Sequence, residues 1–172
     1  SGVVSVADGS LLDRELAASH AVTVRATSSD GTQSSTTFTI QIDDENEFTA
    51  GALSDTDVAN NEVLENAATD SLVGITALAT DDDATATVSY TLQDNAGGRF
   101  QVDSLTGVVT IADGTLLDRE AAASHNLTVV ATSSDGSQST QTYTVQTIDV
   151  NEFGVGSVTD TDSTNNTVLE NA

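Results

Sequence analysis

Several residue types that often stabilise small domains or give them chemistry are missing from this sequence. It contains no cysteine, proline, tryptophan or methionine, and its four basic residues are all arginine. Without cysteine, disulfides and thiolate chemistry are excluded. A small domain then needs another source of stability, and bound metal is the usual one. No apolar run approaches the roughly 18 residues that a membrane-spanning helix needs.

Aromatic side chains are also scarce, with two tyrosines and four phenylalanines in the whole chain. A sugar-binding surface would need exposed rings for stacking, whereas Phe100 and Tyr143 fall at expected core positions. A polysaccharide-binding accessory module of a secreted enzyme is therefore an alternative that the composition weakens. No Ser/His/Asp arrangement is recognisable, so we predict that the chain is not an enzyme. The repeat-equivalent His20 and His125 are expected to serve packing.

The charge is strongly one-sided. The chain carries 27 acidic residues and a formal net charge of −23. Such a surface repels nucleic acid and anionic lipid, and it attracts hard divalent cations where carboxylates cluster. Disorder, which high charge can indicate, is disfavoured because 37% of the residues are hydrophobic and many fall in alternating runs.

The sequence repeats itself at a spacing of 105 residues. Residues 2–48 align without a gap on residues 107–153, and VLENA at 63–67 recurs at 168–172. This predicts the C-terminal half of a repeat at 1–50, a complete repeat at 51–155 and the start of a third at 156–172.

Within the complete repeat, short apolar alternations separated by turn residues predict seven strands and no long helix. Their expected positions are 62–66, 72–79, 88–92, 100–102, 109–111, 127–131 and 143–145. Seven short strands in about 100 residues favour an all-β fold, with tandem immunoglobulin-like antiparallel sandwiches.

The acidic residues gather in short motifs at expected strand ends. One of these motifs in isolation would be a turn or a solvated surface, but several recurring together favour calcium, which binds six to eight oxygens. The motifs are Asp13-Arg14-Glu15 with its copy Asp118-Arg119-Glu120, Asp44-Glu45-Asn46-Glu47 with Asp149-Val150-Asn151-Glu152, Glu65-Asn66 with Glu170-Asn171, Asp81-Asp82-Asp83, and Asp30 with Asp135.

These motifs resemble the calcium motifs of cadherin repeats. Phe100-Gln-Val-Asp103 and Thr106-Gly107-Val-Val109 are similar to the family's F-x-I-D-x-x-T-G-x-I signature. The linker is shortened to DxNEF without proline, residues 48–65 form a longer run than usual, and the cysteine and tryptophan of adhesive animal domains are absent. These departures resemble the bacterial cadherin-like repeats of large secreted or surface proteins.

The resemblance implies calcium ligands at two junctions between repeats. At the first junction it implies about two or three ions, held by Asp13, Glu15, Asp44, Asn46, Glu47, Asp81, Asp83 and Asp135. At the second junction it implies Glu65, Asp118, Glu120, Asp149, Asn151 and Glu152, whose partners would lie beyond Ala172. Asp55, Asp57 and Asn60 could form a further calcium site or Asx turns.

Together these features predict an extracellular or cell-surface rod that calcium stiffens, acting as an extender or adhesive element of a large bacterial protein. Self-association between repeats is a second alternative, beside the polysaccharide-binding module. The expected partners are neighbouring repeats of the same chain, like repeats on other chains or surface polysaccharide, with no nucleic acid and no membrane span. Residues 1–48, as half a sandwich, are expected to be ordered only in an assembly or a longer chain.

Overall fold

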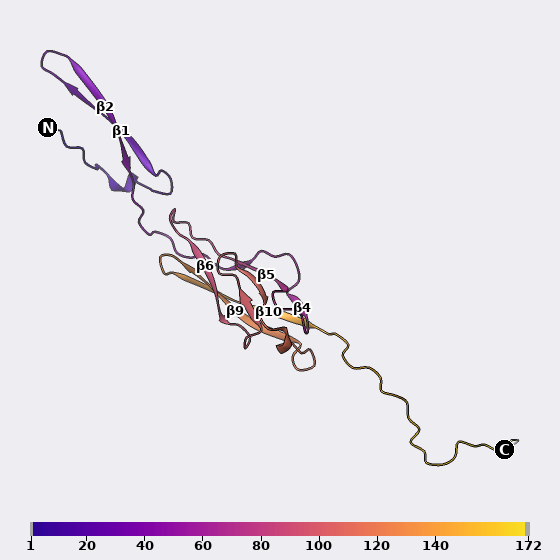
Figure 1. Cartoon of the computed structure of the whole chain (residues 1–172). Coiled ribbons are helices and arrows are strands. Elements are labelled where there is room, and N and C mark those ends of the chain that lie inside the picture. Colours follow the sequence, from indigo (N-terminus) through magenta and orange to yellow (C-terminus); the bar gives the residue numbers. More distant parts are fainter. Residues whose placement is uncertain (1, 171–172) are drawn as a thin grey trace.

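The computed structural model describes residues 2–170 and places a β-sandwich between an N-terminal hairpin and a C-terminal tail (Figure 1). The hairpin strands are β1 (Ser19–Thr27) and β2 (Gln33–Gln41). The sandwich contains β3 (Ser54–Asp55), β4 (Glu62–Leu64), β5 (Leu72–Leu78), β6 (Val88–Asp94), β7 (Phe100–Val102), β8 (Val108–Ile111), β9 (Ser124–Ser133) and β10 (Gln138–Ile148). Two short 3-10 helices, η1 (Gly9–Leu11) and η2 (Gly114–Leu116), occupy equivalent positions in the two repeats.

The sandwich consists of two four-stranded sheets. One has the order β4-β10-β9-β6 and the other β3-β5-β8-β7. The short β4 pairs in parallel with β10, whereas β3 pairs antiparallel with β5, so the beginning of the repeat contributes an edge strand to each sheet. All other pairs are antiparallel. The sandwich confirms the predicted all-β fold class.

The core lies between the two sheets, where alternate residues of each strand point inward. β5 contributes Val73, Ile75 and Ala77, and β9 contributes Leu127 and Val129, all of them buried. The facing strands add Tyr90, Phe100, Val109, Ile111, Tyr143 and Val145. These are the inward positions that the alternation predicts.

Two local features differ from the sequence-based expectation. β3 was not expected, because a strand of two residues is too short to show an alternating pattern. The first expected strand ends at Leu64 rather than Asn66, because Asn66 adopts a positive φ of 57° that no strand tolerates.

The N-terminal half-repeat, residues 2–48, contains β1 and β2 as a two-stranded sheet of their own. Their register pairs Val22 with Phe38 and His20 with Ile40. Val24, Phe38 and Ile40 remain substantially exposed. At the other end of the sandwich, residues 154–170 carry no helix or strand and are exposed.

Candidate metal centres

The first junction, between the half-repeat and the sandwich, brings together two groups of carboxylates. One group is Glu15, Glu47 and Asp83, and the other is Asp81, Asp83 and Asp135. Within each group, one oxygen of every side chain lies within 4.8 Å of the others. The half-repeat supplies Glu15 and Glu47, and the loops that follow β5 and β9 supply the rest.

Asp83 belongs to both groups and is the most enclosed of these acids, with only 7% of its surface exposed. Its carboxylate accepts hydrogen bonds from the backbone N–H groups of Glu47 at 3.1 Å and Phe48 at 3.3 Å. The N–H of the following Ala84 donates to Glu15 Oε1 at 3.1 Å. These contacts cross from one repeat to the next, so the β5–β6 loop and the inter-repeat linker hold each other in place.

Asp44, Asn46 and Asp13 lie beside the two groups, and Asp44 and Asp13 are near enough to Glu47 for their charges to raise its pKa. The Thr85 hydroxyl donates to Asp44 Oδ2 at 2.5 Å, and the Asn46 amide donates to Asp135 Oδ2 at 2.8 Å. Asp13 Oδ1 accepts the N–H of Leu16 at 2.7 Å and so shapes its own turn. The structure therefore brings all eight residues implied for the first junction into one region, with Thr85 as an additional member that no sequence motif marks.

Two carboxylate oxygens of this region are buried and have no hydrogen-bond partner, namely Asp44 Oδ1 and Asp81 Oδ2. A buried acceptor without a donor is costly. A bound cation can satisfy such an oxygen in place of a hydrogen-bond donor. The two oxygens therefore fit a hard metal ion.

The carboxylates of the first junction perturb one another. Desolvation raises the pKa of Glu47 above its ordinary value, and the neighbouring charges of Glu15 and Asp83 raise it further. The Thr85 hydroxyl, in contrast, holds the pKa of Asp44 below its usual range. A nearby negative charge raises the pKa of an acid, whereas a hydrogen bond donated to its carboxylate lowers it.

The second junction, at the far end of the sandwich, carries a third group formed by Glu65, Asp118 and Glu120 within 4.8 Å. Glu65 is 2% exposed, and its two oxygens accept the N–H groups of Val150 at 2.6 Å and Arg119 at 2.7 Å. These hydrogen bonds connect Glu65, near the start of the repeat, to the turn that follows η2 and to the linker after β10. The local turn is completed by the N–H of Ala121, which donates to Asp118 Oδ1 at 2.8 Å.

The remaining residues implied for the second junction, Asp149, Asn151 and Glu152, come from the linker after β10, and Asp149 lies near Glu120. The backbone hydrogen bond of Glu120 itself lowers its pKa, but desolvation and the nearby Glu65 and Asp149 outweigh it, so the pKa is raised. Glu152 accepts a hydrogen bond from the amide of Asn66. Asn151 is exposed. Five acids and one amide are thus present at this end. Three of the acids, Glu65, Asp118 and Glu120, have oxygens close enough together to bind one ion.

Comparison with known proteins agrees with this geometry. Residues 60–151, more than half of the chain, match the model of the cadherin domain. The chain belongs to the cadherin domain family. Cadherin domains are extracellular adhesion modules rather than enzymes, and residues 60–151 of this chain form a β-sandwich of the cadherin type.

Two human relatives and one solved structure illustrate the likeness. Cadherin-related family member 2 is 39% identical over 93 residues, which is 52% of this chain and 7% of the relative. Protocadherin Fat 4 is 32% identical over 150 residues, which is 83% of this chain and 3% of the relative. Chicken VE-cadherin EC1-2 covers 80% of this chain, with 70% of its own chain matched, at a TM-score of 0.62 and 26% identity. The chain thus spans a small part of the length of either human relative. In residues 2–170 no helix is long and apolar enough to cross a membrane.

The long linker of this cadherin chain uses its acids in Asx turns. Asp55 Oδ1 accepts the N–H groups of Asp57 and Thr76, both at 3.0 Å, and Asp57 Oδ1 accepts the N–H of Ala59 at 2.9 Å. The Asn60 carbonyl accepts the N–H of Glu62 at 2.9 Å. Among the described residues, no group of three metal-binding side chains includes Asp55 or Asp57. The geometry favours the turn alternative over a further calcium site.

His125 has the packing position expected for it. Its ring lies edge-on to Phe100 with the centroids 6.3 Å apart, and its Nε2 is buried without a hydrogen-bond partner. The pKa of His125 is held below its ordinary value mainly by desolvation and to a smaller extent by the positive charge of Arg99.

Proposed function

We propose that this cadherin chain is part of an extracellular rod that calcium stiffens, an extender or adhesive element of a large bacterial surface or secreted protein. One observation carries the proposal. Asp83, buried at the first junction, is shared by two carboxylate groups, and one of them, with Glu15 and Glu47, draws residues from two consecutive repeats. A cation bound by Glu15, Glu47 and Asp83 is bound by both repeats at once.

The residue set fits calcium well. The three carboxylate groups and the unpartnered oxygens of Asp44 and Asp81 offer only oxygen ligands, which hard cations prefer. We assign the first junction to Asp13, Glu15, Asp44, Asn46, Glu47, Asp81, Asp83 and Asp135, with about two or three ions. We assign the second junction to Glu65, Asp118, Glu120, Asp149, Asn151 and Glu152.

Stiffening follows from the charges that the linker brings together. Glu47 belongs to the half-repeat, and its pKa is raised partly by Glu15 and Asp83, so the ionised groups of the two repeats repel one another. That repulsion favours a linker that opens. Bound calcium would supply the opposite charge at this point. The backbone N–H groups of Glu47 and Phe48 would then keep their bonds to Asp83, and the two repeats would hold one orientation.

The array context rests on the repeat pattern. Residues 1–50, 51–155 and 156–172 correspond to the end, the whole and the beginning of successive repeats in our proposal. A rod of this type has its neighbouring repeats as first partners, and like repeats on other chains as adhesive partners. The bacterial context is supported by the absence of cysteine, proline and tryptophan and by the short DxNEF linker.

Calorimetry and thermal unfolding test this function directly. In millimolar calcium the midpoint of unfolding should be well above that in excess chelator, because a ligand bound only by the folded form stabilises it. Small-angle scattering should show a longer maximum dimension in calcium than in chelator. Identical melting curves in the two buffers would refute the proposal. Magnesium in place of calcium is the control, since it dehydrates reluctantly and prefers a smaller site.

A further inference from the structure

Thr85 is an uncharged residue among the acids of the first junction, and its hydroxyl makes a bond that crosses from one repeat to the other. It lies in the β5–β6 loop, in a turn that the N–H of Ala86 closes on the carbonyl of Asp83 at 3.1 Å. Its hydroxyl donates to Asp44 Oδ2 at 2.5 Å. Asp44 follows β2 in the half-repeat. Thr85 therefore holds an acid that belongs to the preceding repeat.

This hydrogen bond treats the two oxygens of Asp44 differently. A hydroxyl has one proton to donate, and here Oδ2 accepts it. Oδ1 is buried and has no hydrogen-bond partner, which is costly for a carboxylate oxygen. Carboxylate oxygens are ligands that calcium prefers. The hydroxyl thus fixes one oxygen and leaves the other available to an ion.

Asp44 adjoins the carboxylate group that draws on both repeats. It lies near enough to Glu15 and Glu47 for their side chains to interact. These two residues have oxygens within 4.8 Å of one another and of Asp83. In the absence of an ion, their negative charges repel Asp44. A neutral donor can hold Asp44 there without placing a second cation where calcium would bind.

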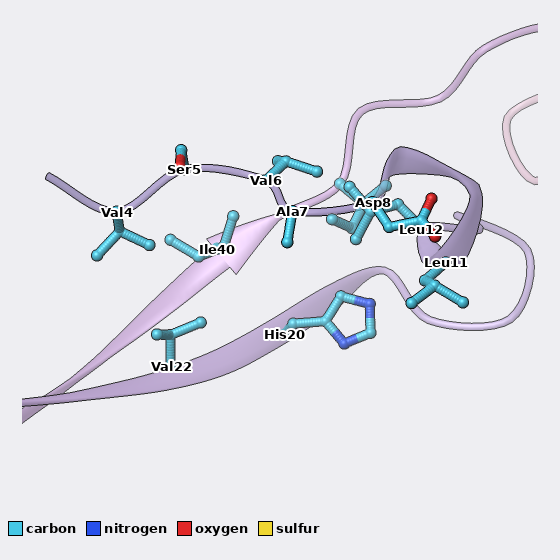
Figure 2. A pocket seen from close by; sticks show the side chains of 11 residues that line it. Val4, Ser5, Val6, Ala7, Asp8, Leu11, Leu12, His20, Val22 and Ile40 are labelled. Atoms are coloured by element: carbon cyan, nitrogen blue, oxygen red, sulfur yellow. The ribbon is translucent and has the colours of Figure 1, made fainter.

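The half-repeat itself supplies little that could hold this side chain. Ile42, two residues earlier, lines a mainly apolar pocket near the end of β2 (Figure 2). Arg14 acts on Asp44 through its charge, but its Nη1 donates to the carbonyl of Ala18 at 3.2 Å. The side-chain hydrogen bond to Asp44 is therefore provided by the downstream repeat.

We propose that Thr85 is a positioning residue for calcium, because its hydroxyl orients Asp44 so that Oδ1 is presented to the ion of the Glu15, Glu47 and Asp83 group. The proposal rests on the proposed calcium function. It adds that the affinity of the junction depends on an uncharged side chain of the downstream repeat, which acts through Asp44 and is not itself a ligand. A junction that lacks this hydroxyl should bind calcium more weakly, even with all its acids in place.

The test titrates the full chain, freed of metal with chelator, with calcium chloride in a calorimeter. Thr85→Val removes the hydroxyl but keeps the β-branched shape. It should lower the affinity of one class of sites by about 10–100-fold, as expected for a residue that supports a ligand. Thr85→Ala should show the same loss, whereas Thr85→Ser, which keeps a hydroxyl, should retain most of the affinity of the parent chain.

Thr87→Val is the matched control. Thr87 is exposed in the same loop and bonds through its backbone N–H, which donates to the Ser134 hydroxyl at 3.1 Å. Its substitution should leave calcium binding unchanged. In chelator, Thr85→Val and Thr87→Val should both melt close to the parent chain. This measurement needs no calcium, and it shows that the sandwich is intact in both variants.

A double-mutant cycle shows whether Thr85 acts through Asp44. The readout is the rise in melting temperature with calcium concentration, which also registers weak binding. Thr85→Val should reduce this rise in the parent chain but have no further effect in an Asp44→Ala background. A general structural role would give the same reduction in both backgrounds, and that result would overturn the proposal.

Two other results would also overturn it, and they differ in what else they affect. If the parent chain binds calcium and Thr85→Val binds it equally well, or no worse than Thr87→Val, the role of Thr85 is wrong while the calcium function stands. If the parent chain binds no calcium, the calcium function fails and the role of Thr85 fails with it.

Discussion

Replacing Asp83 with asparagine should weaken calcium binding at both carboxylate groups of the first junction together. Asp83 is the only residue common to the two groups. Asparagine keeps an oxygen that can accept the N–H groups of Glu47 and Phe48, which lie 3.1 and 3.4 Å from the same Oδ1 of the native carboxylate. The substitution therefore removes a charge from the ion sites while leaving the backbone contacts of the linker available.

The size of the effect follows from the role of the carboxylate. Changing a residue that merely supports a metal ligand costs about 10–100-fold in affinity, and losing a ligand charge should cost at least as much. With calcium in excess, that is about 1.4–2.7 kcal/mol of lost stabilisation for each site. For a domain of about 100 residues, the rise in Tm that calcium produces should shrink by roughly 5–20 °C for each site affected.

Isothermal titration gives the affinity and stoichiometry, and scanning calorimetry gives Tm in calcium and in chelator. Asp82→Asn is the matched control, because Asp82 is exposed, lies in the same triplet and belongs to none of the carboxylate groups. In chelator both variants should unfold close to the parent chain. If Asp83→Asn and Asp82→Asn bound calcium with equal affinity and stoichiometry, the assignment of Asp83 as a shared ligand would be wrong.

Two further predictions use repeat equivalents as controls. Because the pKa of His125 is lowered in the folded chain, its stabilising contribution is complete above the unfolded value near 6.5 and is lost as pH falls through the folded pKa. His125→Gln should flatten this part of the stability–pH curve measured by denaturant unfolding; an unchanged curve would contradict the explanation, and the same substitution at the exposed repeat equivalent His20 is the control. Gly114→Ala would put a Cβ 1.8 Å from the Ala67 carbonyl oxygen and should destabilise the sandwich by at least about 3 kcal/mol. Gly9→Ala meets nothing within 4 Å, so an equally large loss there in thermal melts would contradict the explanation.

The sequence alone was enough for the fold class and for the residue types of the candidate site. Alternation along Leu72–Leu78 and Ser124–Ser133 places valine, isoleucine and alanine on one face, and this is a local property that neighbouring residues decide. The recurrence of LDRE, ENA and DxNEF likewise marks the acids without any coordinates.

Contacts between distant segments were not accessible in the same way. No local spacing shows that Asp83 joins two carboxylate groups, that Thr85 donates to Asp44, or that Glu65 is enclosed by N–H groups from residues 119 and 150. The two-residue strand β3 and the choice of Asx turns over metal at Asp55 also depend on β5, which comes later in the chain.

The plainest case is a pair of identical residues at equivalent positions of two similar strands. Val24 and Val129 lie in copies of the same strand, and the sequence assigns both to an inward face. Val129 is fully buried and Val24 is exposed. Alternation determines which way a side chain points, but only the segment packed opposite it determines whether water is removed. Within residues 2–170, β9 has such a segment packed against it and β1 does not.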